Sequence, residues 1–152
     1  GKLIPKTRWG INKIKEKSMV LTEVRGDIFT TEDKHIVFAL NTEGINDGGF
    51  AGMVASKFFP EIIETGGNKL GEVLSKTVGE KTFHGIVCHS LRNGWVNADE
   101  IILKALNEMR VEENMSIIAI GTGLVGILSG APTGKIYEAF EKCNKNLTPY
   151  MF

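Results

Sequence analysis

Two glycine-rich segments, about seventy residues apart, contain the residues best suited to binding phosphate. The first runs Asn41-Thr42-Glu43-Gly44-Ile45-Asn46-Asp47-Gly48-Gly49-Phe50-Ala51, and the second runs Ile120-Gly121-Thr122-Gly123-Leu124-Val125-Gly126. Each follows a short apolar run that predicts a buried strand, and each precedes a helix-like stretch. A strand that opens into a glycine-rich turn before a helix presents backbone N–H groups to an anion. The pair predicts a site that holds the two phosphates of a nucleotide-sugar diphosphate from opposite sides.

Polar side chains in and near the first segment suit contact with a sugar or a reacting water. The Asn41 amide, at the end of a predicted strand, can bond to ribose hydroxyls, or it can satisfy loose backbone there. Gly48 and Gly49 permit close approach of a ligand. A diphosphate repels Asp47, so this carboxylate faces a water or the ribose, or serves only the turn. His89, at the end of another predicted strand, is a candidate general acid or base, with a bond to backbone as the alternative.

The sequence lacks the motifs of several other kinds of site. The second segment has no Walker lysine, which argues against an NTPase, and it lacks the Rossmann spacing. No cluster of acidic residues or histidines suggests a metal site, and His35 and His84 are predicted to lie on the surface or near loops. Cys88 and Cys143 give neither a disulfide framework nor metal-ligand spacing, so we expect a reducing compartment.

Size and composition indicate one globular domain. The chain of 152 residues is 42% hydrophobic and 24% charged, and its 18 basic and 18 acidic residues leave a formal net charge of zero. The length suits one domain with a sizeable core. Zero net charge argues against a non-specific nucleic-acid binder, which carries a basic excess. No apolar run approaches a membrane span, and the first residues lack the apolar core of a signal peptide. We therefore expect a cytoplasmic protein without membrane contact.

The order of predicted elements indicates the architecture. Residues 1–18 are predicted to form a basic arm, ahead of a single domain over residues 19–152. Strands are predicted at residues 19–24, 36–40, 72–78, 82–90, 116–120 and 147–152, and a hairpin turn at Gly79-Glu80 joins the third to the fourth. Helices are predicted at residues 49–59, at 97–110 with Asn97 and Glu100 as a capping box, and from about residue 132. This order implies an α/β fold, a three-layer α/β/α sandwich around a mixed, mainly parallel sheet.

Three motifs together resemble those of the macro domain, the ADP-ribose-binding fold. They are Val24-Arg25-Gly26-Asp27-Ile28, the Asn41 to Ala51 segment, and Gly121 to Gly126. The resemblance runs from about residue 19 to residue 152 in the right order and spacing. The first loop, from Gly48-Gly49-Phe50-Ala51 to Phe59-Pro60, is similar to the branch that dephosphorylates ADP-ribose 1″-phosphate. The stretch from Ile86 to Phe140 resembles the branch that removes terminal ADP-ribose from protein carboxylates.

The resemblance implies roles for individual residues. Asp27 accepts a hydrogen bond from the adenine amino group, with the Ile28 backbone nearby, although a turn or helix-cap role is the alternative. The second glycine loop wraps the diphosphate and covers the distal ribose. Phe152 or Tyr150 stacks on adenine, with ordinary packing as the alternative. The expected ligand contacts are Asp27, Ile28, Asn41, Asn46, Gly48, Gly49, Ala51, Gly121, Thr122, Gly123, Leu124, Val125, Gly126 and Phe152.

Two residues depart from the glycohydrolase pattern. His89 stands where that branch has a nucleophilic lysine, and Val125 stands where it has a catalytic aspartate, so we expect the lysine-dependent mechanism to be absent. One function left open is a hydrolase of ADP-ribose 1″-phosphate or of an ADP-ribosyl ester, with His89, Asp47 or Asn41 acting on a water. The other is a non-catalytic ADP-ribose reader; sequestration of a different NAD-derived signal molecule is a third. We expect no cofactor and no metal, a monomer, and ADP-ribose, a derivative of it or an ADP-ribosylated protein as partner.

Overall fold

The computed structural model describes residue 21 and residues 23–151. The predicted arm of residues 1–18, half of the strand predicted at 19–24, and Phe152 therefore lie outside the described residues. The helices are α1 (Gly49–Lys57), α2 (Ala98–Glu108), α3 (Leu124–Leu128) and α4 (Thr133–Lys142), with 3-10 turns η1 (Ile28–Thr30) and η2 (Pro60–Ile62). The strands are β1 (Val24–Arg25), β2 (His35–Asn41), β3 (Val73–Val78), β4 (Lys81–His89), β5 (Met115–Ile118) and β6 (Leu147–Met151).

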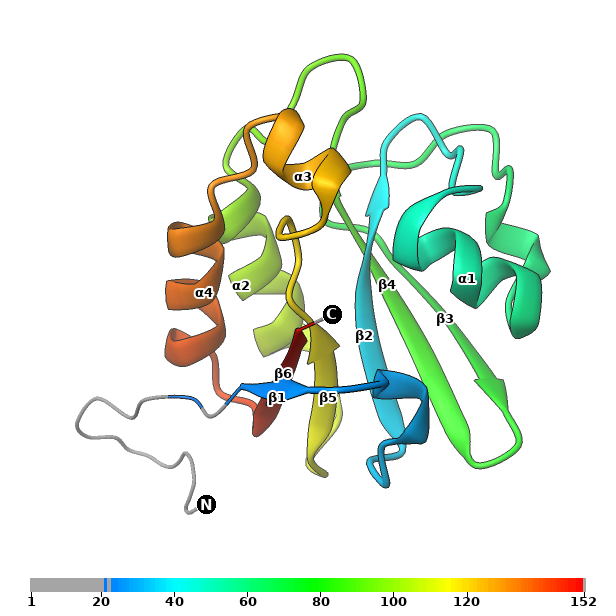
Figure 1. Ribbon diagram of the computed structural model, residues 1–152, viewed down its shortest axis with the longest axis vertical. Coiled ribbons are helices and arrows are strands. Elements are labelled where there is room, and N and C mark those ends of the chain that lie inside the picture. Colours follow the sequence, from blue (N-terminus) through cyan, green and yellow to red (C-terminus); the bar gives the residue numbers. More distant parts are fainter. Residues whose placement is uncertain (1–20, 22, 152) are drawn as a thin grey trace.

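The strands of the described chain form one sheet in the order β1-β6-β5-β2-β4-β3. Neighbouring strands are parallel except at the edge, where β3 runs antiparallel to β4. Helices α2 and α4 pack against each other on one side of the sheet, and α1 covers the other side (Figure 1). The predicted three-layer α/β/α sandwich with a mixed, mainly parallel sheet is therefore confirmed.

The apolar patterns of the sequence account for the central elements. Strand β2 is buried along nearly its whole length, as its continuous apolar run predicts for a strand covered on both faces. Helix α4 buries Ile136, Ala139 and Phe140 at helical spacing. Helix α1 ends before Pro60, which begins η2. Within residues 21 and 23–151, no helix has both the length and the apolar character needed to cross a bilayer.

The predicted capping box at the start of α2 is wrong. Asn97 is the N-cap residue, but its backbone is left-handed, with φ 55°, and its side chain makes no capping hydrogen bond. A side-chain cap is typically formed by a residue with an extended backbone, which the left-handed Asn97 does not have. The helix itself forms as predicted and buries Ala98, Ile102, Ala105 and Leu106.

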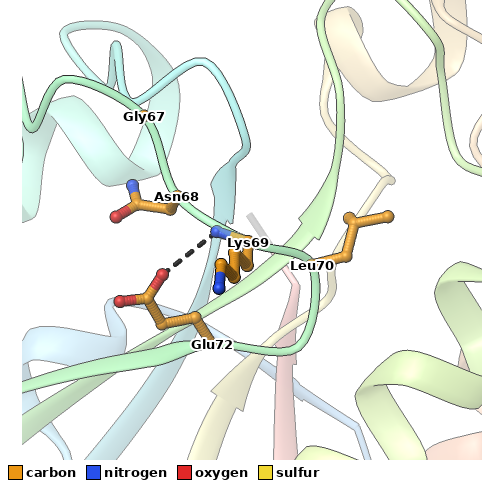
Figure 2. Close-up of a pocket in the computed structure, with 5 residues that line it drawn as sticks. All are labelled: Gly67, Asn68, Lys69, Leu70 and Glu72. Atoms are coloured by element: carbon orange, nitrogen blue, oxygen red, sulfur yellow. Dashed lines mark hydrogen bonds between the residues drawn. The ribbon is translucent and has the colours of Figure 1, made fainter.

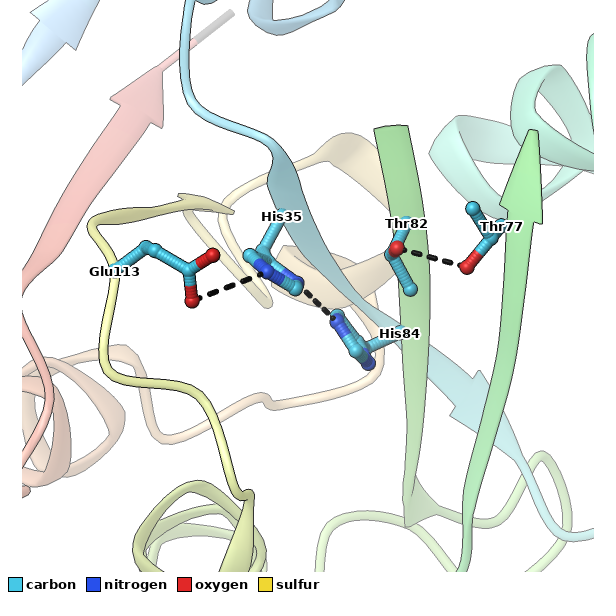
Figure 3. A network of polar contacts seen from close by, with 5 residues as sticks. All are labelled: His35, Thr77, Thr82, His84 and Glu113. Carbon is cyan, nitrogen blue, oxygen red and sulfur yellow. Dashed lines mark hydrogen bonds and ion pairs between the residues drawn. The ribbon is translucent and has the colours of Figure 1, made fainter. Parts of the chain in front are cut away.

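The prediction that His35 and His84 lie on the surface or near loops is wrong for His84, whereas His35 is half-buried and directly follows a loop as the first residue of β2. His84 is 8% exposed on β4, and its Nε2 lies 2.9 Å from Nδ1 of His35 on β2 (Figure 3). His84 Nδ1 lies 2.8 Å from Ser75 Oγ, and His35 Nε2 lies 3.7 Å from a Glu113 carboxylate oxygen. Burial lowers the pKa of His84 to about 4, with a smaller contribution from His35. The pairing of β2 with β4 creates this polar network, and it lies at the end of the sheet where these parallel strands begin.

Candidate functional site

The predicted site residues gather where the parallel strands end. Strands β2, β4 and β5 end at one edge of the sheet, and the loops that follow them lie at the top of Figure 1. We call residues 42–48 loop 1, residues 90–97 the bridging loop, and residues 119–123 loop 2. Asn41 and His89 are register partners at the ends of β2 and β4. Ligand sites in open α/β sheets lie at this edge.

Two buried asparagines hold loop 1 in shape. The Asn41 amide nitrogen donates to the Ile45 carbonyl at 2.8 Å, and its carbonyl oxygen accepts from the Ile45 N–H at 3.2 Å. The Asn46 amide donates to the Ile62 carbonyl at 2.9 Å and accepts from the Asn41 N–H at 3.3 Å. These bonds join the end of β2 to loop 1 and η2. Both side chains therefore have a defined structural role in the folded loop.

The end of loop 1 is open to solvent. Asp47 is exposed, and its carboxylate makes no hydrogen bond or ion pair with the part of the chain that the structure describes. A Cβ added at Gly48 or at Gly49 would meet nothing within 4 Å, and Gly49 has a φ of 60°. Ala51 follows in the first turn of α1 and is half-buried. No side chain therefore crowds the backbone at Gly48 and Gly49, directly after Asp47, and a ligand can approach it there.

The glycines of loop 2 and α3 differ in how closely they are packed. Gly123 is the N-cap residue of α3, and a Cβ added to it would meet nothing within 4 Å. A Cβ at Gly126 would overlap the Gly121 carbonyl oxygen and lie 2.6 Å from its carbonyl carbon. Gly121 is closely packed as well, because a Cβ there would lie 2.7 Å from Ala131 Cβ. Gly121 and Gly126 thus allow a compact connection, whereas Gly123 borders open space. Thr122 is half-buried and donates its hydroxyl proton to the Ala119 carbonyl at 2.6 Å.

Glu43 connects loop 1 to the bridging loop. Its carboxylate accepts from the Ser90 hydroxyl at 2.6 Å and from the Leu91 and Arg92 N–H groups at 2.7 and 3.4 Å. These donors, led by Ser90, lower the pKa of Glu43 to about 2. The carboxylate is therefore ionised at neutral pH. The residues around Glu43 in the sequence do not reveal this role, because Ser90, Leu91 and Arg92 lie almost fifty residues away along the chain.

Trp95 connects the bridging loop to α3. Its indole N–H donates to Ser129 Oγ at 2.8 Å. Its ring stacks on the His89 imidazole, with 4.1 Å between the ring centroids and 14° between the planes. Burial lowers the pKa of His89 to about 4, partly offset by the Glu43 carboxylate. His89 is therefore neutral at pH 7 and has one face covered by an indole. Val125, the other residue that departs from the glycohydrolase pattern, is 68% exposed on α3.

The far end of the site lies where β1 and β6 end. Asp27 is the N-cap of η1, and its Oδ1 accepts from the Phe29 N–H at 2.9 Å, while Ile28 beside it is buried. The other oxygen, Oδ2, makes no hydrogen bond with the described residues. A cavity of about 210 Å³ lies between loop 2 and the first turns of α4. Its lining includes Ala119, Ile120, Thr122, Ile136, Tyr137 and Met151. The Gly26 N–H bonds to the carbonyl of Met151, one of the lining residues, at 3.4 Å, whereas Asp27 itself does not line this cavity.

A second cavity lies outside the predicted site. It is a groove of about 670 Å³, lined by residues 67–72 ahead of β3, where the Lys69 N–H bonds to the Glu72 carboxylate (Figure 2). None of the predicted ligand contacts lines this groove. Within residues 21 and 23–151, histidines, cysteines and carboxylates form no group of three or more that could hold a metal ion.

Comparison with known proteins identifies the fold. No protein-family model matches the chain, and no curated protein matches it. Among solved structures, the macrodomain of Thermus aquaticus DarG matches with a TM-score of 0.64 and 20% identity, over 88% of this chain and 97% of that one. Thermosipho africanus DarTG in complex with ADP-ribose matches with a TM-score of 0.60 and 14% identity, over 90% and 43%. An Oceanobacillus iheyensis macrodomain mutant with ADPR matches with a TM-score of 0.56 and 16% identity, over 84% and 82%. The chain therefore has the macrodomain fold.

Proposed function

We propose that this protein binds ADP-ribose, or a derivative of it, where the parallel strands end. The observation that carries the proposal is the open space at Gly48, Gly49 and Gly123, on loops that leave the neighbouring strands β2 and β5 at the same edge. Backbone N–H groups on two such loops suit a diphosphate. The likeness to Thermosipho africanus DarTG and to the Oceanobacillus iheyensis macrodomain, whose structures contain this ligand, supports the proposal.

The proposed ligand lies across the strand ends with its base toward Asp27. The free Oδ2 of Asp27 accepts from the adenine amino group while Oδ1 caps η1. The cavity of about 210 Å³ between loop 2 and α4 is smaller than a whole ligand pocket, which typically measures about 300–1,000 Å³, so we propose that it takes only the base. The diphosphate then lies at the N–H groups around Gly123, and the distal ribose lies beside loop 1. Phe152, outside the described residues, remains a proposed contact to the base.

The residues of the site favour binding of ADP-ribose without the lysine-dependent cleavage of the glycohydrolase branch. The imidazole of His89 has one face against Trp95, and its pKa of about 4 leaves it without the proton that a general acid donates at pH 7. Val125 has no ionisable group. The two positions that carry the lysine and the aspartate in the glycohydrolase branch therefore offer no amine nucleophile and no charged partner. A reader of ADP-ribose is the function that these residues support best.

One observation favours a second candidate, hydrolysis of ADP-ribose 1″-phosphate. Asp47 is an exposed carboxylate beside Gly48 and Gly49, and no described residue pairs with it. A carboxylate in that position can accept a proton from a water that attacks the terminal phosphorus, with inorganic phosphate and ADP-ribose as the products. N–H groups of the loops would stabilise the negative charge that develops.

Calorimetry and product analysis distinguish the two functions. We expect one-to-one binding of ADP-ribose by isothermal titration, with AMP weaker because it lacks the second phosphate and the distal ribose. Incubation with ADP-ribose 1″-phosphate and with an ADP-ribosylated protein, followed by chromatography, tests for turnover. Binding without product supports the reader, and release of inorganic phosphate supports the hydrolase. Absence of binding at millimolar ADP-ribose would overturn the proposal.

A further inference from the structure

Helix α3 exposes almost all of its side-chain surface although its residues are apolar. Leu124, Val125, Ile127 and Leu128 are 72%, 68%, 62% and 76% exposed, and they are every residue of the helix except Gly126. Gly126 faces inward, because a Cβ added to it would overlap the Gly121 backbone. The helix therefore rests on loop 2 through its backbone. All four of its large side chains are mostly exposed to solvent.

The structure holds this apolar surface in place. Ser129, directly after α3, accepts from the Trp95 indole, and Trp95 in turn stacks on His89. Figure 1 shows α3 at the upper end of the molecule, next to the bridging loop. Val96, beside Trp95, adds a further apolar side chain that is 60% exposed. A surface that is already ordered loses little conformational freedom when a partner covers it.

The exposed apolar area of α3 and its neighbour Val96 is large for a monomeric protein. We call Leu124, Val125, Ile127, Leu128 and Val96 the apolar rim. Its side chains expose roughly 600 Å², at the upper end of the largest apolar patches found on monomeric proteins. A stable interface of standard size buries about 800 Å² on each partner, of which the centre is apolar and the margin polar. The apolar rim is thus large enough to form the centre of such an interface.

The charge pattern indicates what covers the apolar rim. The exposed and half-buried stretch from Gly121 to Gly134, which contains α3, has no charged residue, in a chain that is 24% charged. A nucleic acid or an anionic membrane surface is bound through lysine and arginine, which this stretch lacks. A second copy of the same chain offers an equally apolar and uncharged surface. Two-fold packing of such a surface on itself brings no like charges together.

We propose that two copies of this chain associate through α3, with the apolar rim of each covering that of the other. The sequence alone led us to expect a monomer. The dimer sets the two copies of loop 2 close to each other, because α3 begins directly after Gly123. It does not require ADP-ribose, so it stands or falls independently of the proposed ligand.

Sedimentation velocity of the full chain without nucleotide tests the dimer. We expect the weight-average mass to approach twice the monomer mass as the concentration rises from about 10 μM to about 1 mM, a range that covers weak association. Leu128→Asp introduces a charge at the most exposed side chain of the apolar rim and should keep the protein monomeric throughout. Leu70→Asp is the matched control, because Leu70 is also exposed, at 48%, but lines the groove of residues 67–72. This control should dimerise like the wild type.

The folded state of each variant is checked by circular dichroism and by its Tm. Ile127→Lys replaces Leu128→Asp if the latter fails to fold, with the same expected loss of dimer. A wild-type protein that stays monomeric at about 1 mM overturns the proposal. So does a Leu128→Asp variant that dimerises like the wild type. A monomeric wild type that sediments with phosphatidylcholine vesicles would show that a membrane covers the apolar rim instead.

Discussion

Gly123→Glu separates a phosphate-binding loop 2 from one that merely connects two elements. Gly123 has an ordinary φ of −71°, and a Cβ added to it would meet nothing within 4 Å, so the folded protein accommodates a side chain there. The introduced carboxylate would lie beside the proposed diphosphate. At roughly 6 Å and an effective dielectric constant of about 40, each phosphate charge is repelled by about 1.4 kcal/mol. Two phosphates give about 3 kcal/mol, which weakens binding about 100-fold.

Isothermal titration with ADP-ribose at low salt measures this loss, since salt screens the repulsion. Gly123→Gln is the matched control, because it adds similar bulk without the charge and should lose less affinity. The Tm of both variants should stay within a few degrees of the wild-type value. If Gly123→Glu binds ADP-ribose within about twofold of the wild type, the diphosphate does not lie at loop 2. A large fall in Tm for both variants would instead contradict the open space inferred at Gly123.

Gly126→Ala should lower the free energy of unfolding by about 1–3 kcal/mol, measured by urea denaturation, because its methyl group would overlap the Gly121 backbone. Under the second candidate function, in which ADP-ribose 1″-phosphate is hydrolysed, Asp47→Asn should slow phosphate release by about 100-fold or more while ADP-ribose affinity stays within about twofold; equal losses in both would place Asp47 in binding. The pKa of folded His84 is about 4, against an ordinary value of 6.5, so the unfolded state takes up the proton first on acidification. The free energy of unfolding should therefore fall from pH 6.5 toward pH 4, and His84→Gln should reduce that slope in urea titrations at several pH values.

Patterns that act over a few residues were predicted well. The β3–β4 hairpin around Gly79-Glu80, the buried strand β2 and the inner face of α4 are each confirmed. The reason is that periodicity and turn residues report burial and local backbone geometry directly. Where a local pattern competes with a neighbouring element, it fails. Asn97 has the sequence of a cap, yet it adopts a left-handed backbone at the junction between the bridging loop and α2.

The partners of polar side chains could not be predicted from the sequence. His35 and His84 are 49 residues apart, and only the register of β2 against β4 brings them to 2.9 Å. Glu43 and Ser90 are separated by 47 residues, and Trp95 and Ser129 by 34. Nothing in the residue types around these positions specifies the pairs, because each contact depends on how the strands are ordered in the sheet.

The sequence by itself determined the α/β architecture and the position of two glycine-rich loops after buried strands, because hydrophobic periodicity and glycine spacing are local properties of the chain. Tertiary structure alone decided which glycines border open space and which are packed, since Gly123 and Gly126 look alike in the sequence. It also decided that Trp95 covers His89 and that α3 turns its apolar side chains outward. Contact and exposure belong to the assembled sheet and its loops, and a side chain's chemistry at this site depends on both.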